Sequence, residues 1–302
     1  MSFKIDSELS EDQIESDVAS YLGYVTPFWS KRFRLISVDE QKTGADKLFK
    51  RFIPLYLQFK VSHGLDPEGS ILNRYMNKPL AKIISYRRTN GLTGDPILYF
   101  ELRKLAQTAT DFQHNVLRKT HKPPYTYAFY IAPLTLRLKE YEKLMNRDWH
   151  HRFYRYDPFD IHENDLHDSA TGKSMMLGNN PFLRHHISIP PHIDVNTHKH
   201  HYSYSINGSD IAWHGGDVLS GDYRFSNQLN LVFSQAYKNK DSGFYLRDFI
   251  RSIDELRLEG FPGLHDENNN SEERLRNHVF EFSRYLKFNY NISLYFLTID
   301  NP

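Results

Sequence analysis

Apolar and polar residues alternate most clearly in the segment 55–61, LYLQFKV. Its odd positions are apolar, and its even positions are Tyr56, Gln58 and Lys60. Because successive side chains of a strand point to opposite faces, this pattern predicts a strand with one apolar and one more polar face. Before it, apolar residues at helical spacing predict a helix at 11–22.

The remaining periodicities predict helices and strands in both halves of the chain. Further helices are expected at 70–86, 108–119, 136–145, 243–258 and 272–285. Further strands are expected at 33–38, 127–131, 186–189, 202–206, 228–233 and 292–299. The segment 157–181 has little apolar periodicity and is expected to be a linker or a long surface loop. This mixture indicates an α/β or α+β fold around a mixed sheet.

Composition narrows the class of protein. The chain has 302 residues, of which 39% are hydrophobic and 25% charged, as is typical of a globular protein with one large domain or two ordinary ones. It contains no cysteine, which excludes disulfides, thiolate metal sites and a cysteine nucleophile. The sequence has no apolar run of membrane-spanning length and no signal-peptide core at its start. We therefore expect a cytoplasmic protein with no membrane partner.

Charge is distributed unevenly along the chain, although the net charge is only +1. Residues 1–150 carry 23 Lys and Arg against 17 Asp and Glu, whereas residues 151–302 carry 15 against 20. The basic residues between 31 and 51 are Lys31, Arg32, Arg34, Lys42, Lys47, Lys50 and Arg51. Such a cluster is compatible with contacts to nucleic-acid phosphates and equally with a solvated charged face.

Four residues near the start of the chain have the side chains that phosphodiester hydrolysis requires. The reaction needs a divalent cation held by oxygen ligands, an oriented water and a positive charge near the phosphate. Gln58 and Lys60 lie two apart on the predicted strand and so project from one face. Asp46, after a glycine turn, reaches the same place if the chain before the strand folds back on it as a hairpin. Glu15 lies on the preceding predicted helix.

This ordered set resembles the metal-binding core of the PD-(D/E)XK nuclease superfamily. The family pattern is an acidic residue on a first helix, an aspartate, and then Glu or Gln two residues before a lysine. The segment GADKLFKRFIPLYLQFKVS is similar to the second part of this pattern. The resemblance implies an α/β, restriction-endonuclease-like fold, with a mixed sheet flanked by helices. Residues 1–150 would form the nuclease-like core, and residues 151–302 an α+β C-terminal elaboration of the same domain or a separate unit.

The resemblance also implies a cofactor, a substrate and a role for each site residue. Mg²⁺ or Mn²⁺ would be held by Glu15, Asp46, Gln58 and the backbone carbonyl of Phe59. Lys60 would orient the attacking water and offset the charge of the transition state. The expected substrate is nucleic acid, with DNA favoured over RNA, while sequence preference and oligomeric state stay open.

One further similarity extends this expectation, and one departure from the family pattern leaves an alternative open. The segments ILYFELRKLAQ, DFQHNVLRK and TYAFYIAPL are similar to those of uncharacterised bacterial proteins that carry this core among mobile and defence genes. That similarity implies a role in anti-phage defence, with a protein partner from the same operon. Most family members have Glu where this chain has Gln58, and a neutral amide holds a cation less tightly. The alternative is a catalytically inactive module of the same fold that binds nucleic acid or a partner protein.

Each candidate also has a purely structural interpretation. Asp46 is then a turn residue, Glu15 a solvent-facing helix residue, and Gln58 with Lys60 the wet face of an antiparallel strand.

The histidines form a rival group of candidate ligands, which comprises His150, His151, His185, His186, His192, His198, His200 and His201. Adjacent histidines on a strand point to opposite faces, and the spacing typical of helical zinc sites does not occur. We therefore expect structural roles for them, with His200 or Tyr202 as the candidates for a substrate contact.

Overall fold

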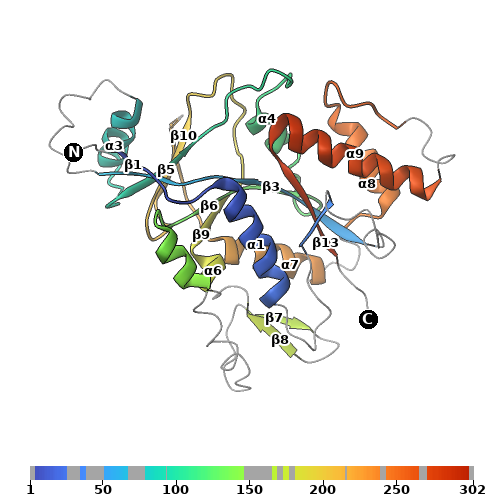
Figure 1. Ribbon diagram of the computed structural model, residues 1–302, viewed down its shortest axis with the longest axis horizontal. Coiled ribbons are helices and arrows are strands. Elements are labelled where there is room, and N and C mark those ends of the chain that lie inside the picture. Colours follow the sequence, from blue (N-terminus) through green and yellow to red (C-terminus); the bar gives the residue numbers. More distant parts are fainter. Residues whose placement is uncertain are drawn as a thin grey trace.

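The computed structural model describes residues 4–25, 35–38, 51–66, 79–92, 94–145, 165–168, 173–176, 181–214, 216–238, 243–264 and 271–298. Over these ranges the protein is mixed α/β (Figure 1). Its helices include α1 (Glu11–Val25), α3 (Pro79–Thr89), α4 (Gln113–Lys119), α6 (Pro181–Arg184), α7 (Phe225–Lys238), α8 (Leu246–Leu256) and α9 (Glu272–Tyr290), and residues 138–145 are also helical. Among the described helices, none is both long and apolar enough to cross a membrane.

A five-stranded sheet positions the candidate site. Its strands are β2 (Leu35–Ser37), β3 (Phe52–Phe59), β6 (Tyr127–Pro133), β9 (His186–Ile189) and β13 (Ser293–Thr298), in the order β2-β13-β3-β6-β9. β3 runs parallel to β6 and antiparallel to β13. Both edges of β3 are therefore occupied, and the predicted hairpin between β3 and the chain just before it is wrong along 52–59. The apolar strand β13 takes that position instead.

A second sheet of six strands is antiparallel throughout. Its strands are β1 (Lys4–Ile5), β4 (His63–Leu65), β5 (Ile97–Glu101), β10 (His201–Ser205), β11 (Ile211–Trp213) and β12 (Asp217–Leu219), in the order β1-β4-β5-β10-β11-β12. Separately, β7 (Asp165–Asp168) and β8 (Lys173–Met176) form an antiparallel pair. This pair lies within 157–181, so the expectation of an irregular linker or loop is wrong for these eight positions.

Helices cover both faces of β3, and every residue from 51 to 60 is buried. On one face, Leu55 and Leu57 pack with apolar residues of α1, α6 and α7. On the other, Tyr56 packs with residues of α4, α8, α9 and the six-stranded sheet. Gln58 and Lys60 are thus buried as well, and their interpretation as the wet face of a strand is wrong.

The predicted strand at 228–233 is instead part of α7. Leu229 and Leu231 alternate with polar residues, as in a strand, but Leu231 is 54% exposed. The buried residues are Phe225, Leu229 and Val232, which recur at helical spacing. A short apolar segment can match both the strand period and the helix period, and the residues that are buried here are spaced as in a helix.

Candidate functional site

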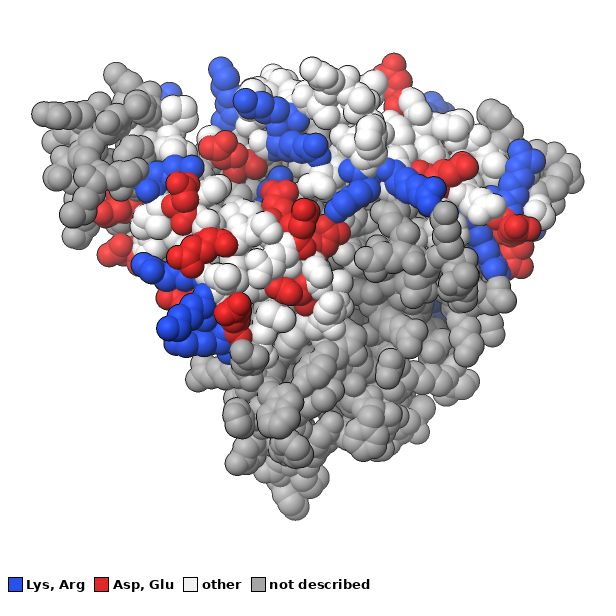
Figure 2. All heavy atoms as spheres, in the orientation of Figure 1, with Lys and Arg blue, Asp and Glu red and all other residues white. Residues whose placement is uncertain are grey.

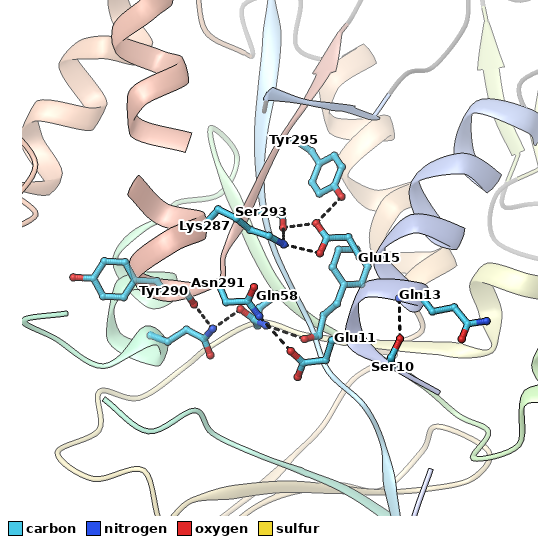
Figure 3. A network of polar contacts seen from close by, with 12 residues as sticks. Ser10, Glu11, Gln13, Glu15, Gln58, Lys287, Tyr290, Asn291, Ser293 and Tyr295 are labelled. Atoms are coloured by element: carbon cyan, nitrogen blue, oxygen red, sulfur yellow. Dashed lines mark hydrogen bonds and ion pairs between the residues drawn. The ribbon is translucent and has the colours of Figure 1, made fainter. Parts of the chain in front are cut away.

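The candidate residues that the structure describes lie around the carboxyl end of β3, beside the first two turns of α1 (Figure 3). Ser10 caps the start of α1, because its hydroxyl accepts a hydrogen bond of 3.2 Å from the backbone N–H of Gln13. Ile14 is fully buried against the five-stranded sheet and fixes the rotation of the helix. Glu11 and Glu15, one turn apart, consequently lie on a common side of α1.

Lys60 directly follows β3 and pairs with Glu11. Its backbone N–H donates to the carbonyl of Ile131 at 2.8 Å, which keeps the residue alongside β6. Its ammonium lies 3.5 Å from Oε1 of Glu11, and the Lys60 side chain is only 7% exposed. Burial lowers the pKa of Lys60, and the charge of Glu11 opposes this effect. Arg103 lowers the pKa further, and its Nη1 atom is buried with no hydrogen-bond partner in the described part of the chain.

Glu15 is bound by residues from the far end of the chain. Nζ of Lys287 lies 2.7 Å from Oε2 of Glu15. The hydroxyls of Ser293 and Tyr295 donate to Oε1 at 2.5 and 3.2 Å. Asn291, which directly follows α9, contacts the other carboxylate of α1, because its Nδ2 donates a hydrogen bond to Glu11 at 3.2 Å.

Gln58 uses both ends of its amide inside the protein. Its Nε2 donates to the backbone carbonyl of Phe59 at 2.8 Å. Its Oε1 accepts a hydrogen bond from Nε2 of Gln113 on α4, and the same Gln113 nitrogen also donates to the carbonyl of Tyr290. Both oxygens predicted as metal ligands, Gln58 Oε1 and the Phe59 carbonyl, therefore already accept internal hydrogen bonds.

The structure brings together three of the four predicted side chains, and the fourth, Asp46, lies outside the described residues. Figure 3 shows Gln58 and Glu15 in one network of polar contacts at the end of β3, and Lys60 joins this network through its ion pair with Glu11. Within it Lys60 contacts Glu11 rather than Glu15. The basic residues between 31 and 51, which were considered for contacts to phosphates, also lie outside the described ranges, except Arg51, which is buried.

The oxygen atoms that could bind a metal ion are those of carboxylates, an amide and a backbone carbonyl, which are the ligands that a hard divalent cation prefers. The described residues supply too few of them for a complete metal site. No group of three or more His, Cys, Asp or Glu side chains that could hold a metal occurs in the part of the chain that the structure covers. Glu11 and Glu15 supply two carboxylates, of which only Glu15 belongs to the predicted set, and the other predicted carboxylate, that of Asp46, lies outside the described residues.

The face that carries α1 is charged around this network. Figure 2 shows acidic side chains gathered near the start of α1, with basic side chains next to them. The two signs adjoin rather than form a single field, which agrees with the ion pairs Lys60–Glu11 and Lys287–Glu15.

Sequence reasoning missed the residues that support the predicted set. Glu11 had a signal, because it lies four positions before Glu15 on the same predicted helix. Gln113 lies in the quoted segment DFQHNVLRK, but nothing local pairs it with Gln58. Lys287 and Asn291 had no signal at all, since their role depends on how the C-terminal half packs.

The histidines of the second sheet are packed among aromatic rings. The ring of His200 stacks on Trp213, with centroids 4.9 Å apart. Tyr202 is fully buried, and its hydroxyl lies 3.1 Å from Nδ1 of His192. A direct substrate contact by Tyr202 is therefore not supported, and packing is its role in this structure.

Comparison with models of known families, with curated proteins and with solved structures finds no match for this chain. The resemblance of its N-terminal segment to PD-(D/E)XK nucleases thus stays an expectation. What the protein does is inferred from its residues and their geometry.

Proposed function

We propose that this protein is a metal-dependent nuclease of the restriction-endonuclease-like type, which hydrolyses phosphodiester bonds of DNA at the carboxyl end of β3. The observation that carries the proposal is the buried lysine ammonium at that strand end, 3.5 Å from a carboxylate of the first helix. Lys60 and Glu11 are 49 residues apart in sequence. The sequence pattern assigned the acidic position of this helix to Glu15, and Lys60 pairs with Glu11, one turn earlier on the same helix. A role in anti-phage defence remains part of this proposal.

The residues of this network suit the chemical demands of the reaction. A bound Mg²⁺ or Mn²⁺, held by Glu15, Asp46, Gln58 and the Phe59 carbonyl, would supply a Lewis acid for the phosphate. Lys60 donates hydrogen bonds to the attacking water and offsets the negative charge that develops on the phosphate oxygens. Glu11 holds the Lys60 side chain in place, and Asn291 holds Glu11.

One observation favours the alternative, a catalytically inactive module that binds nucleic acid or a partner protein. The carboxylate of Glu15 is already contacted by Lys287, Ser293 and Tyr295, and the cation of Lys287 balances its charge. A metal ion at Glu15 competes with these contacts. Both functions use the same fold, so a measurement of metal binding distinguishes the nuclease from the inactive module.

The first prediction tests Lys60 with the substitution Lys60→Met. Methionine keeps much of the volume and removes the charge, and Glu11 stays partly solvated, so the variant is expected to fold. Cleavage of plasmid and of short duplexes with Mg²⁺ or Mn²⁺ should fall by about 10²-fold or more, as when one donor to a transition-state oxyanion is removed. Circular dichroism and thermal unfolding report the folding of each variant.

The matched control is Lys82→Met, which removes an exposed lysine of α3. Equal cleavage rates for the two variants would remove Lys60 from the chemistry. Calorimetric titration of Mg²⁺ into the wild type and Asp46→Ala distinguishes the alternative. The nuclease requires metal binding that Asp46→Ala weakens, whereas the inactive module requires no metal there.

A further inference from the structure

Arg103 follows β5 where the two sheets adjoin. After β3 the chain continues through Lys60 into β4, and His63 of β4 is the register partner of Tyr99 on β5. Continuing this antiparallel register back towards the end of β3 leads from His63 to Lys60 on one side and from Tyr99 to Leu102 on the other. Arg103 therefore belongs to the segment of chain beside the candidate site.

The guanidinium of Arg103 has a buried donor without an acceptor. Its Nη1 atom is buried and has no hydrogen-bond partner in the described part of the chain, although the residue as a whole is only partly buried. The positive charge of Arg103 also acts on the Lys60 ammonium, whose pKa it lowers. A buried, unpaired donor costs free energy, and so does the repulsion between two cations. An anion that binds beside both cations removes both costs.

The described carboxylates of β5 and α1 have partners of their own. Glu101, two residues before Arg103, lies 3.4 Å from Nε2 of His201. Glu11 lies 3.5 Å from Lys60, and the second carboxylate of α1 is neutralised in its ion pair with α9. Lys60 and Arg103 thus carry two positive charges, and Glu11 supplies one negative charge. The surplus positive charge suits an anionic group of a substrate.

We propose that Arg103 is a substrate-binding residue of the candidate site, whose guanidinium donates hydrogen bonds to the non-bridging oxygens of the phosphate that is bound beside Lys60. A planar guanidinium matches two oxygens of one phosphate, whereas a lysine ammonium acts as a point charge. Arg103 would therefore orient the phosphate, and Lys60 would act on the water and on the developing charge. The inference rests on the proposed function, because it assigns Arg103 to the same phosphodiester substrate.

Binding is measured in EDTA, so cleavage plays no part. A short labelled DNA duplex is titrated with the wild type, Arg103→Gln and Lys104→Gln by fluorescence anisotropy at a series of salt concentrations. Arg103→Gln should weaken binding about tenfold or more, which corresponds to one hydrogen-bonded pair with a charged group. The slope of log K against log salt should become shallower by about 1. Lys104→Gln is the matched control, because it removes the same charge from the next, exposed residue, and it should weaken binding much less.

Thermal unfolding distinguishes a binding role of Arg103 from a structural one. Arg103→Gln removes a repulsion with Lys60, so it should be at least as stable as the wild type. Inorganic phosphate, compared with chloride at equal ionic strength, should raise the unfolding midpoint of the wild type more than that of Arg103→Gln. The inference is overturned if Arg103→Gln binds the duplex as tightly as Lys104→Gln, or if its loss of binding accompanies a loss of stability.

Cleavage with Mg²⁺ or Mn²⁺ distinguishes a failure of this inference from a failure of the nuclease function. If the wild type binds the duplex through Arg103 but does not cleave it, the phosphate site stands and belongs to the inactive module. If the wild type cleaves and Arg103→Gln cleaves as fast as Lys104→Gln, the nuclease stands and the phosphate contact of Arg103 is wrong. A wild type that neither binds nor cleaves the duplex overturns both.

Discussion

At the scale of single residues, a substitution of Gln58 tests whether its side-chain amide is a metal ligand or only packs inside the protein. In Gln58→Glu, the carboxylate can still accept the hydrogen bond from Gln113, but it cannot donate to the Phe59 carbonyl. Without metal, the variant should therefore lose on the order of 1–3 kcal/mol in the free energy of unfolding. Mg²⁺ should recover much of this loss, because a cation between two oxygens removes their repulsion. Urea unfolding with EDTA and with Mg²⁺ measures both effects.

The control for this prediction is Gln107→Glu at an exposed position. It adds the same charge where no buried oxygen faces it, and surface changes of this size have little effect. If Mg²⁺ stabilises both variants equally, Gln58 is not a metal ligand.

The pattern around Gln58 and Lys60 could be predicted from alternation along one strand. The contact of Gln58 with Gln113 could not, because it joins residues 55 positions apart through tertiary packing alone.

At the scale of elements, the end of α9 connects backbone geometry to the candidate site. Asn291 has φ 51°, in the left-handed region, and its N–H closes the helix on the carbonyls of Leu286 and Lys287. Its side chain donates to Glu11. Asn291→Gly should keep stability within a few tenths of a kcal/mol, whereas Asn291→Ala should lose about 1 kcal/mol. Thermal unfolding at neutral pH tests this.

Both Asn291 variants lose the hydrogen bond to Glu11, so the proposed nuclease activity should fall equally in the two. A fall in activity that follows stability instead would mean that Asn291 acts only as a helix cap.

Short strands could be predicted only in part. The strand β9 has the bounds that were predicted, 186–189. β5, β11 and β12, which are of similar length, were not predicted. Segments of three to five residues carry too short a pattern to identify every strand.

At the scale of the whole molecule, buried neutral histidines should make the protein sensitive to acid. Burial lowers the pKa values of His114 and His186 to about 4 and that of His214 to about 3. His114 donates from Nε2 to the carbonyl of Ile193 and accepts at Nδ1 from Tyr130, so it is held neutral. Between the unfolded pKa of 6.5 and the folded value, only the unfolded chain binds the proton.

Stability should therefore fall as pH falls from about 6.5 to about 4, by about 3 kcal/mol for His114 alone. Urea unfolding at a series of pH values measures the slope. His114→Gln should flatten it, and His198→Gln, at a partly exposed position without such contacts, should not. An unchanged slope in His114→Gln would contradict the assignment of His114 as a buried neutral group.

The mixed α/β class could be predicted from the sequence, because strands and helices intermix along it. The order of strands in the central sheet could not. β13 lies between β2 and β3, and pairing of segments more than two hundred residues apart leaves no local trace. For the same reason Lys287 and Ser293, which hold Glu15, could not be associated with it in advance.

The place of β13 also sets the time at which the protein becomes functional during its synthesis. A ribosome makes residues 4–290 before it makes β13, so until then β3 has an open edge and Glu15 lacks Ser293 and Tyr295. Closing the sheet across such a separation is slow compared with local folding. A nascent chain therefore cannot assemble the polar network at the end of β3 while it is still being translated through that point. Under the proposed nuclease function, this delay would keep unfinished chains from cutting DNA.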